Sequence, residues 1–390
     1  MPSVPLLAFA ALLASTAPAA AAPPPPPASA HAVDPRPALQ RGLDELTGRH
    51  GLAGAAAEVT GRGGERWSAA SGRADLGTGR AMNATDRFRI GSITKTFTAA
   101  TALQLVDEGL LSLDAPVDRY LPGLVRGNGY DGRTITVRQL LQHTSGLPDH
   151  STALADADVT WLRRHHFTPR ELVGLALREP RPASQWHYST TNYVLVGMVI
   201  EQVTRRPVEA EVTRRVIEPL GLRDTYWPGS SPTIRGPHSR SYFTTHDNGD
   251  NADDWDDGEP VRVDGTTWNT SAGGAGGALI STASDVNAFF AALLDGRLLS
   301  PERLADMRTT VPGDPARLGP EGRYGLGLIT GPLSCGGRFT GHTGGTRAGH
   351  HTIGAVAADG RQVTVVVNET PRTDASTDAL LAVMDTALCR

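Results

Sequence analysis

The stretch FRIGSITK, at residues 88–95, determines the expected fold and the expected chemistry of this chain. It sets a serine, Ser92, three positions before a lysine, Lys95. From Ser92 onwards apolar residues recur with a helical period, and Gly109 suits the C-terminal cap of that helix. Both side chains are therefore expected on one face of the first helical turn, where the positive end of the helix dipole favours a developing alkoxide.

The chain contains 37 Lys and Arg residues, and Lys95 is the only lysine among them. Arginine is not deprotonated in proteins, whereas a buried lysine changes its pKa readily and can act as a base. In so biased a composition, one lysine could also survive by chance. Its place three residues after a serine at a helix start favours the other interpretation, a serine nucleophile activated by Lys95.

Several further stretches, taken together, resemble the serine β-lactamase and penicillin-binding protein superfamily. Within it the chain is most similar to the secreted actinobacterial D-alanyl-D-alanine carboxypeptidases and to their class C β-lactamase and esterase relatives. The similarity runs from about Leu39 to Cys389. Its stretches are residues 88–95, 105–109, 113–117, 135–147, 188–193 and 341–344.

The second motif of that family, Y-x-N, is matched by Tyr188, Ser189 and Thr190. The resemblance implies that Tyr188 carries protons between the serine, the leaving group and water. A buried core tyrosine is the alternative, but the polar residues before the apolar helix at 194–200 favour a loop that enters a helix. Thr190 replaces the usual asparagine, so recognition of a peptide-like substrate is less secure.

The third motif is matched by His342, Thr343 and Gly344, which the resemblance sets on an edge strand facing the nucleophile. His342 would relay protons or orient the tyrosine; an exposed loop histidine is the alternative. The glycines would let a substrate approach the backbone closely. By the same resemblance, the backbone N–H groups of Ser92 and Gly345 form the oxyanion hole.

Three positions bear on substrate choice. In the carboxypeptidases that this chain resembles, an arginine six residues before the first bridge cysteine helps to bind the terminal carboxylate, and that position is Ile329 here. Arg347 could supply the charge from another direction. Trp268 approximately matches an aromatic wall of the acyl pocket.

Hydrolysis of D-alanyl-D-alanine cell-wall peptides is therefore the leading interpretation. An esterase, a β-lactamase and a non-catalytic penicillin-binding sensor remain open.

The composition excludes several classes of partner. A formal net charge of −4 and a pI near 6.3 give no reason to expect nucleic acid. After the N-terminus no apolar run approaches the roughly 20 residues that span a bilayer. The chain has no phosphate-binding or dinucleotide-binding motif, and the aspartates of residues 247–257 do not match calcium-loop spacing, so no cofactor and no metal are expected. We expect a monomer that acts on a small molecule or peptide.

The N-terminal 30 residues are interpreted as a signal peptide followed by a proline-rich spacer. Residues 4–14 are apolar and residues 17–22 offer small-x-small cleavage sites, although the n-region lacks Lys and Arg. Export would take the two cysteines into an oxidising compartment, so Cys335 and Cys389 are expected to pair.

Residues 31–390 are expected to form one hydrolase domain of the α/β (α+β) class. The pattern predicts an antiparallel β-sheet flanked by helices, with an inserted, mostly helical region at about 110–290. The expected helices are residues 38–49 and a closing helix to Cys389. The expected strands are residues 53–60, 65–72, 323–329, 340–342, 351–357 and 362–368.

Overall fold

A nine-stranded antiparallel sheet is the centre of this computed structural model, which describes residues 35–245 and 261–389. The described residues belong to one compact unit, Asp34–Arg390. In spatial order the strands are β10 (Val311–Pro312), β11 (Arg323–Tyr324), β12 (Ile329–Pro332), β13 (Arg338–Gly345), β14 (His351–Ala357), β15 (Gln362–Val367), β1 (Gly54–Thr60), β2 (Arg66–Asp75) and β3 (Arg80–Ala81). The expected antiparallel sheet flanked by helices is confirmed.

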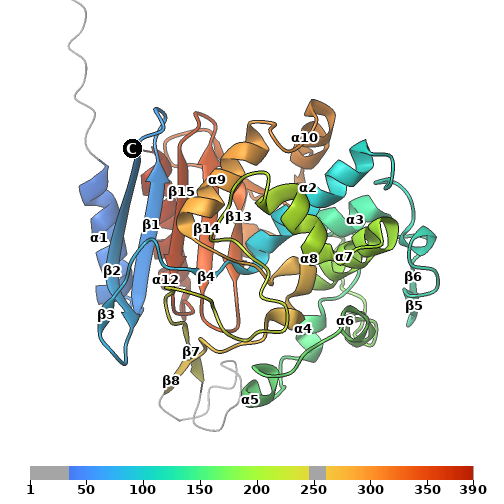
Figure 1. Ribbon diagram of the computed structural model, residues 1–390, viewed down its shortest axis with the longest axis horizontal. Coiled ribbons are helices and arrows are strands. Elements are labelled where there is room, and N and C mark those ends of the chain that lie inside the picture. Colours follow the sequence, from blue (N-terminus) through green and yellow to red (C-terminus); the bar gives the residue numbers. More distant parts are fainter. Residues whose placement is uncertain (1–34, 246–260, 390) are drawn as a thin grey trace, which may run out of the picture. The chain divides into compact units, whose positions relative to one another are not determined.

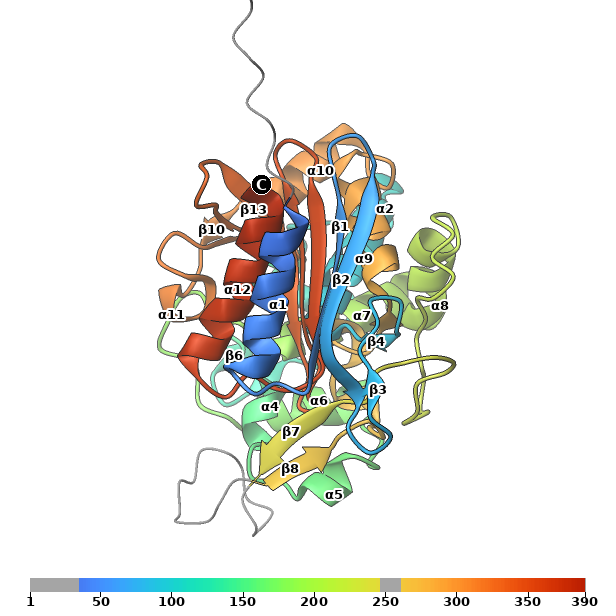
Figure 2. The same ribbon diagram turned by 90° about the vertical axis from the view of Figure 1, so that its left-hand side faces the viewer.

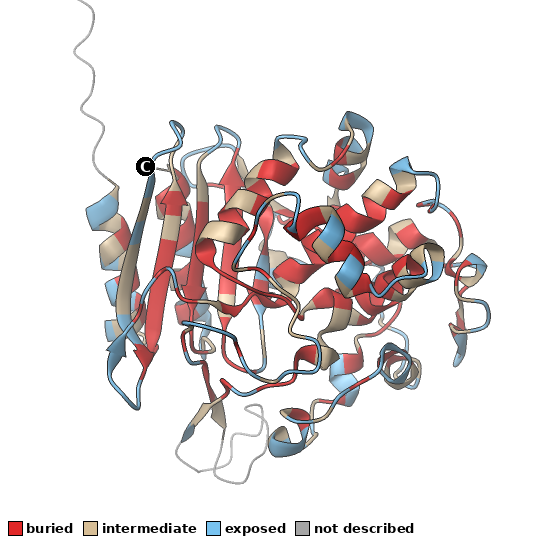
Figure 3. Ribbon diagram, viewed as in Figure 1, coloured by how far each residue is buried: buried red, intermediate tan, exposed pale blue. Residues whose placement is uncertain are grey.

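Helices cover both faces of the sheet (Figures 1 and 2). α1 (Arg36–Gly48) and α12 (Asp374–Cys389) pack against each other and against one face, while α9 (Ala283–Leu294) packs against the other. Successive side chains of a strand point to opposite faces. In β1, Ala55 and Ala57 accordingly join the core beneath α1 and α12, and Ala56 joins the core on the other side. Burial on both faces explains why the central strands are apolar almost throughout (Figure 3).

The region between β3 and β10 is mostly helical. Its α-helices are α2 (Thr94–Asp107), α3 (Val137–Gln142), α4 (His150–Ala153), α5 (Val159–Leu162), α6 (Pro169–Ala176), α7 (Thr190–Thr204), α8 (Val208–Val212), α9 and α10 (Pro301–Arg308). Short 3-10 turns include η1 (Gly91–Ile93), η4 (Thr270–Ala272) and η5 (Gly274–Gly276), and a π-helical turn, η3 (Thr213–Ile217), follows α8. Two-stranded ladders join β4 (Phe88–Arg89) to β9 (Ile280–Ser281), β5 (Arg126–Gly127) to β6 (Tyr130–Asp131), and β7 (Tyr242–Thr245) to β8 (Val261–Asp264). A further short helix, α11 (Pro315–Leu318), lies between β10 and β11.

Two expectations about the C-terminal strands are wrong. Residues 323–329 do not form one strand, because β11 and β12 pair with each other as a hairpin and residues 325–328 are its turn. Gly327 has φ +80°, a conformation that glycine adopts without strain. β13 is not an edge strand either, since it lies between β12 and β14. However, β12 pairs with β13 only as far as Gly341, so residues 342–345 have no ladder partner on the β12 side.

Cys335 and Cys389 form a disulfide, with their Cα atoms 5.5 Å apart. The bridge ties the end of α12 to the turn between β12 and β13. A cross-link across 54 positions stabilises the fold by about 4 kcal/mol in the chain-entropy account. The expected signal peptide and spacer at residues 1–30, and most of the acidic stretch at residues 247–257, lie outside the described residues. Within residues 35–245 and 261–389, no helix has the length and apolar character needed to cross a bilayer.

Candidate active site

Ser92 lies on the 3-10 turn η1, immediately before α2, rather than in the first α-helical turn that the periodicity predicts. Gly91 has φ +50°, and a Cβ there would lie 2.6 Å from the carbonyl oxygen of Gly345. A Cβ on Gly344 would lie 2.0 Å from the carbonyl oxygen of Ile90. Glycine at both positions therefore lets the end of β13 pack directly against the turn that carries the serine.

Lys95 is fully buried one turn further on, in α2. Its Nζ lies 3.1 Å from Ser92 Oγ, 2.9 Å from the carbonyl oxygen of Gly276 and 3.4 Å from Thr190 Oγ1. No carboxylate lies within ion-pair distance of it in the described part of the chain. A neutral amine fits these partners, since it can donate to the carbonyl oxygen and accept the serine proton.

Gly276 is a part of the site that the sequence did not reveal. A Cβ at this position would lie 2.8 Å from Thr190 Cγ2 and 3.2 Å from Lys95 Nζ. The glycine-rich turn at residues 273–277 therefore approaches the lysine closely enough for the Gly276 carbonyl oxygen to accept its hydrogen bond. Only the run of glycines hinted at a close backbone approach, and it named no partner.

Tyr188 lies two residues before α7, and its ring centroid is 4.8 Å from Lys95 Nζ. Its ring is largely buried, in a cluster with Trp186, Tyr324 and Ile329. On the cavity side, the guanidinium of Arg317 lies over the same ring, with Cζ 3.7 Å from the centroid. Two cations thus flank the tyrosine, one beneath the site and one at its mouth.

His342 is buried in β13, and hydrogen bonds engage both of its ring nitrogens. Nδ1 lies 2.5 Å from the carbonyl oxygen of Thr343, which makes it the protonated nitrogen, so Nε2 accepts from the Tyr324 hydroxyl at 2.9 Å. Burial, followed by the charge of Lys95, lowers the pKa of His342 to about 3. The neutral ring therefore holds Tyr324, which packs edge-on against Tyr188. A relay role for His342 stays a prediction.

His143 is a second buried histidine, which the sequence quoted only within a motif. It caps the C-terminus of α3 in the left-handed conformation, at φ 62°. Its Nδ1 accepts from the backbone N–H of Ser189 and from Asn192 Nδ2, both at 3.2 Å. Its ring centroid is 4.3 Å from that of Tyr188. Burial lowers its pKa well below the ordinary value, so a neutral imidazole fixes the loop that carries Tyr188.

A cavity of about 280 Å³ opens beside Ser92. Of the residues predicted from sequence, its lining includes Ser92, Tyr188, Thr190, Trp268 and Gly345. Lys95 and His342 lie buried behind this lining, Gly344 packs under η1, and the side chain of Thr343 is exposed on β13.

Ile329 and Arg347 give the cavity no carboxylate clamp. Ile329 is buried beside Tyr188. Arg347 donates from Nη1 and Nη2 to the carbonyl oxygens of Leu154 and Ala155, at 2.7 and 2.9 Å.

Asp149 supplies a negative charge to the cavity lining. Its Oδ2 accepts the N–H of Thr190 at 2.9 Å, and its Oδ1 accepts the N–H of Ser151 at 3.0 Å. Burial raises its pKa, but the neighbouring charge of His150 and these two hydrogen bonds outweigh burial and hold the pKa below the ordinary value. The carboxylate is therefore ionised at neutral pH.

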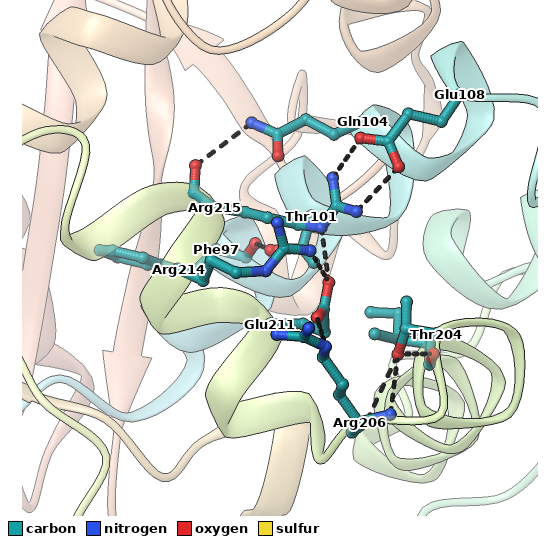
Figure 4. Close-up of polar contacts among 10 residues, drawn as sticks. Phe97, Thr101, Gln104, Glu108, Thr204, Arg206, Glu211, Arg214 and Arg215 are labelled. Atoms are coloured by element: carbon teal, nitrogen blue, oxygen red, sulfur yellow. Dashed lines mark hydrogen bonds and ion pairs between the residues drawn. The ribbon is translucent and has the colours of Figure 1, made fainter.

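The far end of α2 is held by buried charge (Figure 4). Glu211, in α8, is fully buried and accepts from Arg215 Nε at 2.6 Å and from Arg214 Nη2 at 2.7 Å. Arg215 also donates to both carboxylate oxygens of Glu108, the C-cap of α2. The helix that carries Lys95 is thus bonded at its C-terminal end to η3.

Comparison with known proteins identifies the family. A family model described as Beta-lactamase matches residues 39–387. The chain belongs to the β-lactamase family. Together with the relatives described next, this makes it a serine hydrolase of the β-lactamase and penicillin-binding protein superfamily.

Two solved structures in this family are similar over nearly their whole length. A D-stereospecific amidohydrolase from Streptomyces sp. is 37% identical, with a TM-score of 0.79, over 89% of this chain and 98% of that one. A D-amino acid amidase from Ochrobactrum anthropi SV3 is 29% identical, with a TM-score of 0.74, over 90% and 98%. Among curated relatives, the esterase EstB of Burkholderia gladioli is 34% identical over 209 residues. That match spans 49% of this chain and about half, 51%, of the esterase.

Proposed function

We propose that this hydrolase cleaves amide bonds on the carboxyl side of D-amino acids, through an acyl-enzyme on Ser92. The observation that carries the proposal is the buried Lys95 amine, 3.1 Å from Ser92 Oγ and bonded to a carbonyl oxygen rather than to a carboxylate. Such an amine is available as a base for the serine. The two similar structures named for D-amino acid substrates support the choice of acyl donor.

Acylation begins when Ser92 Oγ attacks the carbonyl carbon and its proton passes to Lys95. Collapse of the tetrahedral intermediate breaks the C–N bond, and the leaving nitrogen takes the proton of the Tyr188 hydroxyl. In deacylation the Tyr188 phenolate takes a proton from water, which attacks the ester carbonyl carbon. Ser92 Oγ then leaves and regains its proton from the Lys95 ammonium, which restores every group.

The backbone N–H groups of Ser92 and Gly345 would bind the oxyanion in both steps. The close packing of η1 against the end of β13 supports this assignment, because it brings the two backbone segments together. Fixed donors that face developing charge are typically the largest electrostatic contribution to acyl transfer. The walls contributed by Trp268 and Thr190 would then hold the acyl side chain.

The test uses the full chain, its Ser92→Ala variant and a Ser68→Ala control, in which the replaced serine is exposed on β2. Each protein is incubated with D- and L-phenylalanine amide, a D-Ala-D-Ala peptide, a short-chain nitrophenyl ester and a penicillin. We expect turnover of the D-amide by the wild type and the control only, together with a mass adduct that Ser92→Ala lacks. A folded wild type that forms neither product nor adduct would refute the mechanism.

A D-Ala-D-Ala carboxypeptidase is the second candidate, and the cation Arg317 beside Tyr188 favours it. Ester turnover without amide turnover would instead indicate an esterase. A fast penicillin turnover would indicate a β-lactamase, and a single stalled adduct a sensor. We further propose a secreted monomer without cofactor, a proposal supported by the Cys335–Cys389 disulfide.

A further inference from the structure

Four cations stand at or beneath the cavity, and three of them already have hydrogen-bonded partners. Lys95 contacts Ser92 and the Gly276 carbonyl. Arg89 is 1% exposed, and its Nη2 donates to the carbonyl oxygens of Pro232, Thr266 and Trp268 at 2.8, 2.8 and 3.1 Å. Arg347 donates to two carbonyl oxygens of the loop after α4. These three guanidinium and amine groups hold the walls of the site.

Arg317 differs from the other three. It belongs to α11, its residue is exposed, and it lines the mouth of the cavity. Its guanidinium stacks on Tyr188, yet its side chain has no hydrogen bond or ion pair to any residue in the described ranges. A cation–π contact uses none of the five N–H donors of arginine. Those donors are available to a ligand.

The position of Arg317 beside Tyr188 determines which part of a substrate it meets. Under the proposed function, Tyr188 must come within hydrogen-bonding distance of the leaving nitrogen. The guanidinium, with Cζ 3.7 Å from the centre of the tyrosine ring, then lies against the leaving group and not against the acyl group.

The rest of the lining directs a negative substituent to the same place. Asp149 is the one carboxylate among the described lining residues, and it is ionised, so it would repel a substrate carboxylate from its own side of the cavity. Ile329, where related carboxypeptidases carry the clamping arginine, is apolar and buried beside Tyr188.

We infer that Arg317 binds a carboxylate on the leaving group, so the preferred substrates are peptides whose leaving amine is an amino acid with a free carboxyl group. This inference rests on the proposed amide hydrolysis and narrows its substrate class. The fork of the guanidinium matches a carboxylate in a bidentate pair. α11 would thus supply, from a different element, the charge that position 329 lacks.

The test compares a D-alanyl-D-alanine peptide with the same peptide ending in a methylamide. The values of kcat/KM for both are measured for the wild type, Arg317→Gln, Arg317→Lys and the control Arg297→Gln, an exposed arginine outside the cavity lining. We expect the wild type and the control to favour the free acid by about tenfold or more, as charged hydrogen bonds do. Arg317→Gln should bring the ratio close to one, and Arg317→Lys should retain part of it.

Using the ratio separates recognition from a structural effect, because a displaced Tyr188 would slow both peptides equally. A nitrophenyl ester checks that Arg317→Gln still forms the acyl-enzyme. If the wild type hydrolyses D-phenylalanine amide but shows no preference for the free acid, or if Arg317→Gln keeps that preference, the inference about Arg317 is wrong. If the wild type hydrolyses no amide at all, the proposed function itself fails.

Discussion

Replacing Gly276 by alanine tests how strictly the site depends on a side chain being absent from one turn. The new Cβ would lie 2.8 Å from Thr190 Cγ2 and 3.2 Å from both Lys95 Nζ and Tyr193 Cβ. The φ of Gly276 lies outside the left-handed region, so the backbone itself accepts alanine. The effect is therefore steric, and it falls on the group that activates the serine.

The size of the effect follows from these distances. Ordinary contacts of this kind begin near 3.4 Å, so α7 or the glycine-rich turn must move by about 0.6 Å to relieve the contact with Thr190. A misplacement of 1 Å in a catalytic site can cost about 100-fold in rate, so we expect acylation to slow by about tenfold. Overpacking should also lower the free energy of unfolding by about 1–3 kcal/mol.

The assay is the rate constant of the burst phase with a nitrophenyl ester, measured with thermal unfolding of the same samples. Gly174→Ala in α6 is the control, since a Cβ there meets no atom within 4 Å. The control should acylate as fast as the wild type. If folded Gly276→Ala also acylated at the wild-type rate, Gly276 would not set the position of Lys95.

Three further perturbations address other parts of the molecule. Lys95→Arg should fold but lose at least about 100-fold in acylation, because arginine does not take the serine proton; intact mass after incubation with ester checks this, and retained acylation would refute the base role. Glu211→Gln should cost about 3 kcal/mol in urea unfolding, since it leaves Arg215 without its buried partner, and an unchanged midpoint would contradict that account. The pKa of His342 falls from 6.5 to about 3 on folding, so the unfolded chain takes up a proton below pH 6.5 that the folded chain refuses, and stability declines as pH falls through that range. His342→Gln should therefore lose less stability between pH 7.5 and pH 5, and an identical decline would show that His342 does not contribute to it.

Periodic and local features of the fold were predictable from the sequence. The strand at residues 351–357 is found with the predicted bounds, and the strand at 362–368 differs by one residue. The helix after Ser92 ends as predicted, with Glu108 as its C-cap and Gly109 at φ 72°. Each of these depends on neighbouring residues alone, which is what a sequence pattern reports.

Features that depend on contacts through space were not predictable. The run at residues 323–329 has the composition of a strand, but pairing between its two ends turns it into a hairpin. The acceptor for Lys95 is a backbone carbonyl oxygen of Gly276, and a carbonyl group leaves no trace in a sequence. Arg317 was overlooked because its relation to Tyr188 arises from a four-residue helix 129 positions further along the chain.

The pairing of β1 with β15 has a consequence for the order of folding. Strands that are distant in sequence pair only after a long loop has closed, which slows folding. The N-terminal hairpin of β1 and β2 therefore waits for strands made some three hundred residues later, and the serine turn waits for β13, on which it packs. The nucleophile is thus assembled among the last parts of the molecule, and a partly synthesised chain would carry Ser92 and Lys95 without being able to acylate.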